Sequence, residues 1–83
     1  MNKEFWSVYV LECVDTTFYT GITNDVPKRI KAHNLKKGAK YTRGKTPVKL
    51  VYSEQLPTRS DALKREHEIK KLSRDQKLSL IYN

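Results

Sequence analysis

The stretch that decides the fold is WSVYVLECVDTTFYTGIT, residues 6–23. Its first part, Trp6–Cys13, is rich in Val, Tyr and Leu and has the composition of a buried strand. Residues 14–17 are turn-like, and Phe18–Thr23 has the composition of a second strand. Two strands separated by so short a turn predict a β-hairpin.

Each strand of this predicted hairpin carries a tyrosine, Tyr9 on the first and Tyr19 on the second. A tyrosine in a strand most often packs against its neighbours, with its hydroxyl at the rim of the core. The two rings share a face of the sheet only if paired positions sum to an even number, which requires a loop of odd length such as residues 15–17. A loop of even length would separate the two phenols. Gly21, within the second strand, indicates a bulge or a close approach of the backbone.

After the hairpin, helical and extended patterns alternate along the chain. Asn24 and Asp25 can cap a helix that reaches Lys36 or Lys37. Residues 36–47 form a basic loop with room for one helical turn, and 48–55 predict a third strand that places on one side Val48, Leu50 and Tyr52. A helix capped at or beside residue 60 reaches residue 72. A capping-box pattern at residues 73–76 then opens a last helix to about residue 81.

This order of elements predicts an α+β fold: a small three-stranded antiparallel sheet, made of the hairpin and one later strand, flanked by helices. A chain of 83 residues is expected to form one domain, residues 1–83. It carries 17 Lys and Arg against 9 Asp and Glu, a net charge of +8, which favours a polyanionic partner such as DNA or RNA. A basic surface without a partner, a ribosome-associated protein or a membrane-surface protein would have the same charge.

Cysteine and histidine usage excludes some classes of site. One cysteine, Cys13, cannot form an internal disulfide, and its apolar surroundings predict a buried thiol. A zinc motif cannot be built from this cysteine with His33 and His67, and His67 is expected to face solvent. No signal peptide or membrane-spanning stretch is evident, so we expect a cytoplasmic protein, a monomer that binds no membrane.

Glu66 is the most informative single position. It falls within the apolar stripe of the helix over 60–72, formed by Ala62, Leu63, Ile69 and Leu72. Removing a carboxylate from water is costly unless a cation or metal compensates it. The more frequent explanation is a buried or half-buried salt bridge to an arginine such as Arg29, and the functional one is a catalytic or metal-binding carboxylate.

Arg29 and His33 lie four residues apart and share one face of the preceding helix. A guanidinium can hold a phosphate through two hydrogen bonds, and an imidazole can transfer a proton. Taken alone, this spacing favours a solvated face, because Lys28 and Lys31 lie on the same helix. The basic segment after this helix interleaves cations with one aromatic residue, a pattern that favours phosphate contact over a merely solvated loop, through Lys36, Lys37, Lys40, Tyr41, Arg43 and Lys45.

Together these residues resemble the GIY-YIG nuclease family over nearly the whole chain. Val8-Tyr9-Val10 is similar to the first signature, with Val for both Gly and Ile, and Tyr19-Thr20-Gly21 is similar to the second, with Thr for Ile. Arg29, the His33-Asn34 pair and Ala62–Glu66 follow in the family's order. The pattern resembles the short single-domain bacterial branch and the nuclease domain of structure-selective junction enzymes.

The resemblance implies hydrolysis of phosphodiester bonds with one divalent metal, Mg²⁺ or Mn²⁺, held by Glu66. It implies that Arg29 stabilises charge on the phosphate oxygens, that Tyr9 or Tyr19 orients or deprotonates the attacking water, and that His33 assists. Gly21 would let the nucleic-acid backbone approach. A second domain usually supplies targeting in this family and none is evident here, so a protein targeting partner is expected.

Three classes of function remain open. The first is a metal-dependent endonuclease acting on DNA, structure-selective and used in DNA repair or recombination. The second is a non-catalytic nucleic-acid-binding accessory module on the same fold, and the third is a domain that binds an acidic protein. A carboxylate that faces phosphates repels them unless a metal intervenes, which favours the nuclease. We expect Tyr9, Tyr19, Arg29 and Glu66 to open onto one shared concavity.

Overall fold

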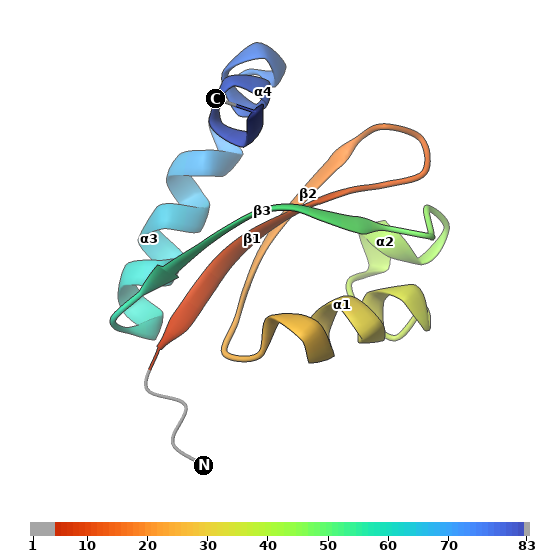
Figure 1. Cartoon of the computed structure of the whole chain (residues 1–83), viewed down its shortest axis with the longest axis horizontal. Helices are drawn as coiled ribbons and strands as arrows, with labels where there is room; N and C mark the ends of the chain where they lie inside the picture. Colours follow the sequence, from red (N-terminus) through yellow and green to blue (C-terminus); the bar gives the residue numbers. More distant parts are fainter. Residues whose placement is uncertain (1–4, 83) are drawn as a thin grey trace.

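The computed structural model describes residues 5–82, and there it contains one antiparallel sheet of order β2-β1-β3 with four helices (Figure 1). The elements are β1 Trp6–Glu12, β2 Phe18–Thr23, α1 Val26–Asn34, α2 Lys40–Arg43, β3 Lys49–Leu56, α3 Arg59–Lys70 and α4 Arg74–Tyr82. The predicted fold class is confirmed. No helix within residues 5–82 is both long and apolar enough to span a membrane.

The hairpin pairs Tyr9 with Gly21 and Leu11 with Tyr19. The residue numbers of each pair add up to an even number, which is the result of a loop of odd length. Both tyrosine side chains therefore lie on one face of the sheet. The loop has three residues, 14–16, because the Cys13 N–H donates to the Thr17 carbonyl at 2.8 Å. It therefore begins one residue earlier than the predicted loop 15–17.

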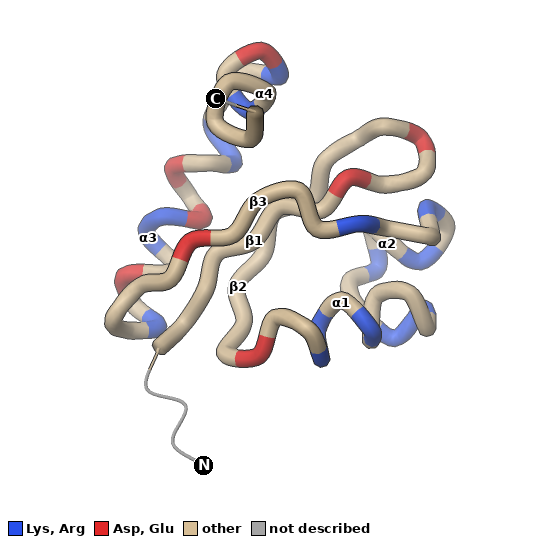
Figure 2. The backbone as a smooth tube through the Cα atoms, in the orientation of Figure 1, with Lys and Arg blue, Asp and Glu red and all other residues tan. Residues whose placement is uncertain are grey.

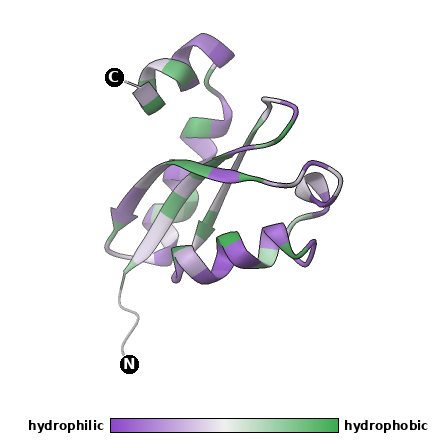
Figure 3. Cartoon of the chain, turned by 45° about the vertical axis from the view of Figure 1, so that its right-hand side comes forward, coloured by the Kyte–Doolittle hydropathy of each residue, from purple (hydrophilic) through white to green (hydrophobic). Residues whose placement is uncertain are grey.

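The sheet separates two layers with different chemistry. On one face Val8 and Val10 pack against Ala62 and Ile69 of α3, with side chains of α4 at the border of this core. The other face carries Tyr9, Leu11, Cys13 and Val48, and it is covered by α1 and α2. Figure 1 shows the two helix pairs on opposite sides of the sheet, and Figure 3 shows that α1 and α3 are largely hydrophilic with hydrophobic residues interspersed. The predicted buried thiol of Cys13 is confirmed.

The first helix is shorter than predicted. It ends at Asn34 rather than at Lys36 or Lys37, because Lys36 adopts a left-handed conformation with φ 63°. The N–H groups of Lys36 and Lys37 turn back to the carbonyls of His33 and Ala32, at 3.0 and 2.9 Å. This is the Schellman arrangement, with a lysine in the position that glycine usually takes.

Three further boundaries differ from the prediction. The third strand starts at residue 49, and its register with β1 shifts between Val10 and Leu11, so Tyr52 pairs with Val10 whereas Leu50 pairs with Leu11. Leu50 and Tyr52 therefore do not share one side, as simple alternation predicts. Helix α3 spans 59–70 instead of 60–72, because the Thr58 side chain caps it. The capping box is confirmed: at the start of α4 Ser73 and Gln76 exchange hydrogen bonds.

Two glycines make room for buried side chains. A Cβ atom on Gly21 would lie 2.6 Å from the hydroxyl oxygen of Tyr9 and 2.8 Å from its Cζ. A Cβ atom on Gly38, in the loop before α2, would lie 2.7 Å from Cγ of His33. Tyr9 and His33 are themselves fully buried. The close approach predicted at Gly21 is thus made by a side chain, and the hairpin pairing has no bulge there.

We predict that Gly21→Ala and Gly38→Ala each lower the free energy of unfolding by about 1–3 kcal/mol, because the added methyl group must displace a packed ring. In a domain of this size each kcal/mol lowers Tm by roughly 4–8 °C. The matched control is Gly44→Ala, where a Cβ atom meets nothing within 4 Å. Equal thermal stability of all three variants would contradict this account of the packing.

Candidate active site

A chain of hydrogen bonds runs through the buried part of the α1–α2 face. The Tyr9 hydroxyl lies 2.9 Å from Nε2 of His33, and Nδ1 of His33 lies 2.8 Å from Oγ1 of Thr42. The Thr42 hydroxyl donates to the carbonyl of Ala39 at 2.9 Å. Since that proton is already engaged, Thr42 accepts from Nδ1–H of His33. Nε2 then carries no proton and accepts the hydroxyl proton of Tyr9.

Three elements hold this chain in place. Tyr9 is central in β1, His33 is in the last turn of α1, and Thr42 is in α2. Asn34, next to His33, ties α1 to the start of β3: its side chain donates to the Val48 carbonyl at 3.2 Å and accepts from the Val48 N–H at 2.8 Å. Tyr9, His33 and Thr42 are each at most 1% exposed. The solvated face that the Arg29–His33 spacing favours is wrong for His33, because the structure buries its ring completely.

Charged groups from two helices act on the Tyr9 hydroxyl. Burial raises its pKa above the ordinary value, a hydrogen bond from the Arg29 side chain opposes this rise, and the nearby Tyr19 and Glu66 reinforce it. Burial, and then the charge of Arg29, lower the pKa of His33. The imidazole is therefore held neutral, as the hydrogen-bond direction requires. Arg29 of α1, Tyr19 of β2 and Glu66 of α3 thus all influence the pKa of this one hydroxyl on β1.

Aromatic rings extend from this centre towards the surface. The ring centroid of Tyr19 lies 6.3 Å from that of Tyr9 and 5.3 Å from that of His33. Tyr41 stacks on Tyr19, with centroids 6.0 Å apart and an interplanar angle of 26°. The ammonium of Lys45 lies 4.0 Å from the centroid of the Tyr41 ring. Tyr41 of the basic segment thus extends the aromatic cluster that Tyr9, Tyr19 and His33 form.

Glu66 is half-buried on α3, with 19% of its side chain exposed, and its carboxylate lies 3.4 Å from Nζ of Lys70. The salt bridge to Arg29 that the sequence suggested is not among the ion pairs of the described residues. Leu63, predicted to lie in the apolar stripe with Glu66, is 40% exposed, so the buried stripe is narrower and is formed by Ala62 and Ile69. Within residues 5–82 no cluster of three or more potential ligands could bind a metal on its own.

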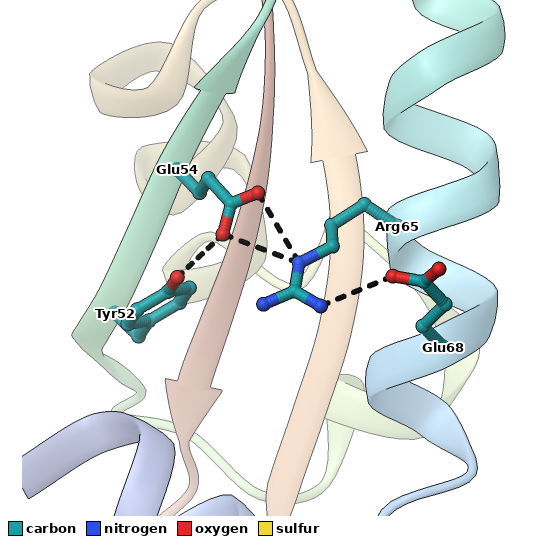
Figure 4. Close-up of polar contacts among 4 residues, drawn as sticks. All are labelled: Tyr52, Glu54, Arg65 and Glu68. Carbon is teal, nitrogen blue, oxygen red and sulfur yellow. Dashed lines mark hydrogen bonds and ion pairs between the residues drawn. The ribbon is translucent and has the colours of Figure 1, made fainter.

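A polar network next to Glu66 fixes how α3 sits against the sheet (Figure 4). The hydroxyl of Tyr52 donates to Glu54 at 2.6 Å, and Nε of Arg65 lies 3.2 Å from both carboxylate oxygens of Glu54. The Arg65 guanidinium also reaches Glu68 at 3.0 Å. Because Arg65 precedes Glu66 directly, this anchor to β3 sets the direction in which Glu66 projects from the helix.

Three of the site residues line surface depressions. Arg29 borders one of about 240 Å³, Tyr19 one of about 290 Å³ and Glu66 one of about 470 Å³. Lys70 links two of them, since it lines the depression of Tyr19 and pairs with Glu66.

The predicted phosphate-contacting segment divides into two groups. Lys36, Lys37, Lys40 and Arg43 are exposed, and Figure 2 shows basic residues gathered around α1 and α2. Lys45 is engaged instead: it lies 3.2 Å from Asp15, and its contacts with Tyr41 and Asp15 raise its pKa. The sequence carries no local signal for the roles of Thr42 and Gly38, which depend on the return of the chain over His33. His67 is exposed, as predicted.

Comparison with known proteins places this geometry in a family. Residues 5–79 match the model of the GIY-YIG catalytic domain. A UPF0213 protein of Clostridium perfringens is 60% identical over 74 residues, which cover 89% of this chain and 80% of the relative. Another, from Haloquadratum walsbyi, is 53% identical over 78 residues, which cover 94% and 88%.

Solved structures agree with this assignment. The solution structure of a UPF0213 protein from Bacillus halodurans matches with a TM-score of 0.60 and 48% identity, over 93% of this chain and 82% of that one. The solution structure of a protein from E. faecalis matches with a TM-score of 0.64 and 43% identity, over 95% and 84%. The chain therefore belongs to the GIY-YIG catalytic domain family and is similar to its small UPF0213 members.

Proposed function

We propose that this protein is a metal-dependent endonuclease that hydrolyses phosphodiester bonds of DNA, with Tyr9 and His33 relaying the proton of the attacking water. The observation that carries the proposal is the buried hydrogen bond from the Tyr9 hydroxyl to Nε2 of His33, whose direction Thr42 fixes. Any buried tyrosine hydroxyl needs a hydrogen-bond partner. Here the partner is a neutral imidazole that can accept a proton, and a guanidinium and a carboxylate both act on the same hydroxyl.

The proton path follows from this direction. The reaction requires a water to reach the Tyr9 oxygen, which is buried in the free protein. That water gives a proton to the Tyr9 oxygen while Tyr9 gives its own proton to Nε2 of His33. The water oxygen forms a bond to phosphorus, the bond from phosphorus to the leaving oxygen breaks, and the leaving oxygen takes a proton from solvent. After the products leave, Nε2 returns its proton through Tyr9 to solvent, which restores the neutral imidazole. Because the pKa of Tyr9 is raised, the phenol is neutral before the reaction and acts as a relay rather than as a stored phenolate.

Arg29 is suited to the phosphate itself. Its side chain lies close enough to the Tyr9 hydroxyl to hydrogen-bond it, so a phosphate that approaches the attacking water also approaches the guanidinium. Charge on the non-bridging oxygens increases as the new bond forms, and two parallel N–H groups stabilise it. We assign Arg29 this role, and we assign Tyr19, which lies against both Tyr9 and His33, the orientation of the water.

Glu66 fits a hard divalent cation. Its carboxylate is half-buried, and its partner is an exposed lysine at 3.4 Å, a weak pair that is readily exchanged. Mg²⁺ and Mn²⁺ bind oxygen, and Mg²⁺ commonly takes one or two protein carboxylates together with water and substrate phosphates, so the single carboxylate of Glu66 can serve as its protein ligand. When bound, such an ion supplies Lewis-acid stabilisation of the phosphate and of the leaving oxygen.

Two observations bear on the choice between this proposal and a non-catalytic module. The exposed cations of the α1–α2 region serve binding under either hypothesis. The convergence of Glu66, Arg29 and the Tyr9–His33 pair serves only catalysis, because a half-buried carboxylate weakens the binding of phosphate. We assign this activity a biological role in DNA repair or recombination. In that role the protein acts on branched DNA and is directed there by a targeting partner.

We predict that Glu66→Ala lowers the cleavage rate by at least about a hundredfold, because stabilisation of the transition-state charge is lost. DNA binding in the same variant persists or tightens, because a negative charge is removed from the site. The assay compares plasmid, single-stranded and branched DNA with Mg²⁺ or Mn²⁺. The matched control is Asp75→Ala, which removes an equal charge from an exposed position on α4 and retains activity.

Wild-type protein that binds DNA with a steep salt dependence but cleaves none of these substrates would overturn the nuclease in favour of an accessory module. Wild-type protein that neither binds nor cleaves would favour an acidic protein partner.

We also predict a pH dependence of stability that reports the protonation of His33. Its pKa is lowered in the folded protein, so below about pH 6.5, the usual value in an unfolded chain, the unfolded state binds more protons. The stability is fully present above that pH and is lost as the pH falls through it towards the folded pKa. Urea unfolding between about pH 5 and 8 lies above the range in which ordinary carboxylates titrate.

In this experiment His33→Gln removes the loss of stability at low pH, whatever its effect on absolute stability. The control His67→Gln, at an exposed position on α3, keeps the same loss of stability as the wild type. Identical slopes for the wild type and His33→Gln would show that the imidazole is not held neutral by burial.

A further inference from the structure

A cleft of about 290 Å³ lies next to the candidate active site. Its lining comes from four elements and consists of Phe18, Tyr19, Thr20, Tyr41, Lys70 and Lys77. We call this set of residues the β2 cleft, because three of them belong to that strand. Tyr19 is shared with the candidate active site, and Lys70 pairs with Glu66. A group bound in the β2 cleft is therefore an immediate neighbour of whatever the active site holds.

The β2 cleft contains an aromatic ring that is exposed to solvent but held in place by its neighbours. Tyr41 remains 45% exposed although it is an aromatic residue. Its ring is stacked on Tyr19, and Lys45, which Asp15 holds at 3.2 Å, lies over it. The ring is thus fixed before any ligand binds, which reduces the ordering cost of binding. The ring of Phe18 contacts a protein cation instead, since the guanidinium carbon of Arg74 lies 5.0 Å from its centroid.

Cations complete the chemistry of the cleft. Lys70 of α3 and Lys77 of α4 line it together with Tyr41 of α2. Ordered aromatic rings interleaved with ammonium groups are the combination that binds single-stranded nucleic acid: bases contact the rings, and phosphates contact the cations. A paired base within a duplex is covered on both faces by its neighbours and cannot make such a contact without leaving the stack.

We propose that the β2 cleft binds an unpaired nucleotide adjoining the scissile phosphate, so that the preferred substrate is DNA that is single-stranded at the cleavage position. This inference rests on the proposed nuclease function for the position of the scissile phosphate. Tyr19 stacks on Tyr41 and Lys45 lies over the same ring, so the base takes the place of Lys45 against Tyr41, and its phosphate lies between Lys70 and Lys77. Occupation of Lys70 by that phosphate also releases Glu66 from its ion pair, which couples substrate binding to the availability of the carboxylate.

The test is a binding measurement without divalent metal, in EDTA, using fluorescein-labelled oligo-dT and the duplex that it forms with oligo-dA. Wild-type protein binds the single strand more tightly than the duplex. Tyr41→Leu weakens single-strand binding by about tenfold, the effect typical of losing one stacked base, and leaves duplex binding unchanged. The matched control is Tyr82→Leu, at an exposed tyrosine of α4 outside the cleft, which changes neither.

Tyr41→Trp keeps an aromatic surface and retains single-strand binding, so it separates loss of the ring from damage to the fold. Equal binding of both ligands by the wild type, or equal losses in Tyr41→Leu and Tyr82→Leu, would overturn the inference. Because the assay records binding alone, its outcome is independent of the nuclease proposal. A protein that cleaves DNA but shows no dependence on Tyr41 refutes only the cleft, and a protein with the predicted binding that never cleaves refutes only the nuclease.

Discussion

A hydrogen bond of 2.9 Å joins the Tyr9 hydroxyl to Nε2 of His33 in the protein interior, and much of the surrounding structure is needed to keep it there. A buried polar group without a partner costs about 1–3 kcal/mol, so every residue of this hydrogen-bond network must have a hydrogen-bond partner. Thr42 and the Ala39 carbonyl complete it, and no buried side-chain polar atom among the described residues lacks a partner. Gly21 and Gly38 leave the space that the two rings occupy.

The two faces of the sheet contribute differently to stability and to the candidate site. The face under α3 and α4 buries an aliphatic core around Val8, Val10 and Ile69, which supplies hydrophobic stabilisation. The face under α1 and α2 buries polar side chains in a fixed arrangement. Glu66 belongs to a helix of the first layer yet acts on Tyr9 of the second. The site therefore forms where α3, which contacts β2, meets the layer of α1, and it depends on both layers being folded.

The sequence is a good guide wherever local rules decide the outcome. Hairpin parity reduces the question of whether Tyr9 and Tyr19 share a face to the length of one loop, and the structure shows the odd loop. The capping box at Ser73 predicts the start of α4. The same rules fail where distant contacts decide. The end of α1 depends on a left-handed lysine where glycine is usual, and the sides of β3 depend on a register shift that alternation does not reveal. Thr42 has no signal of its own, because only the folded chain brings it to His33.

The proton position on His33 is the most direct test of the account, because the relay requires Nδ1–H towards Thr42 and a bare Nε2 towards Tyr9. Long-range proton–nitrogen NMR correlation of ¹⁵N-labelled protein at neutral pH distinguishes the two neutral tautomers and the imidazolium, with His67 as a solvent-exposed reference. We expect a single neutral His33 with its proton on Nδ1. A proton on Nε2, or a charged imidazolium, would contradict the account, because Tyr9 would then have no base to receive its proton.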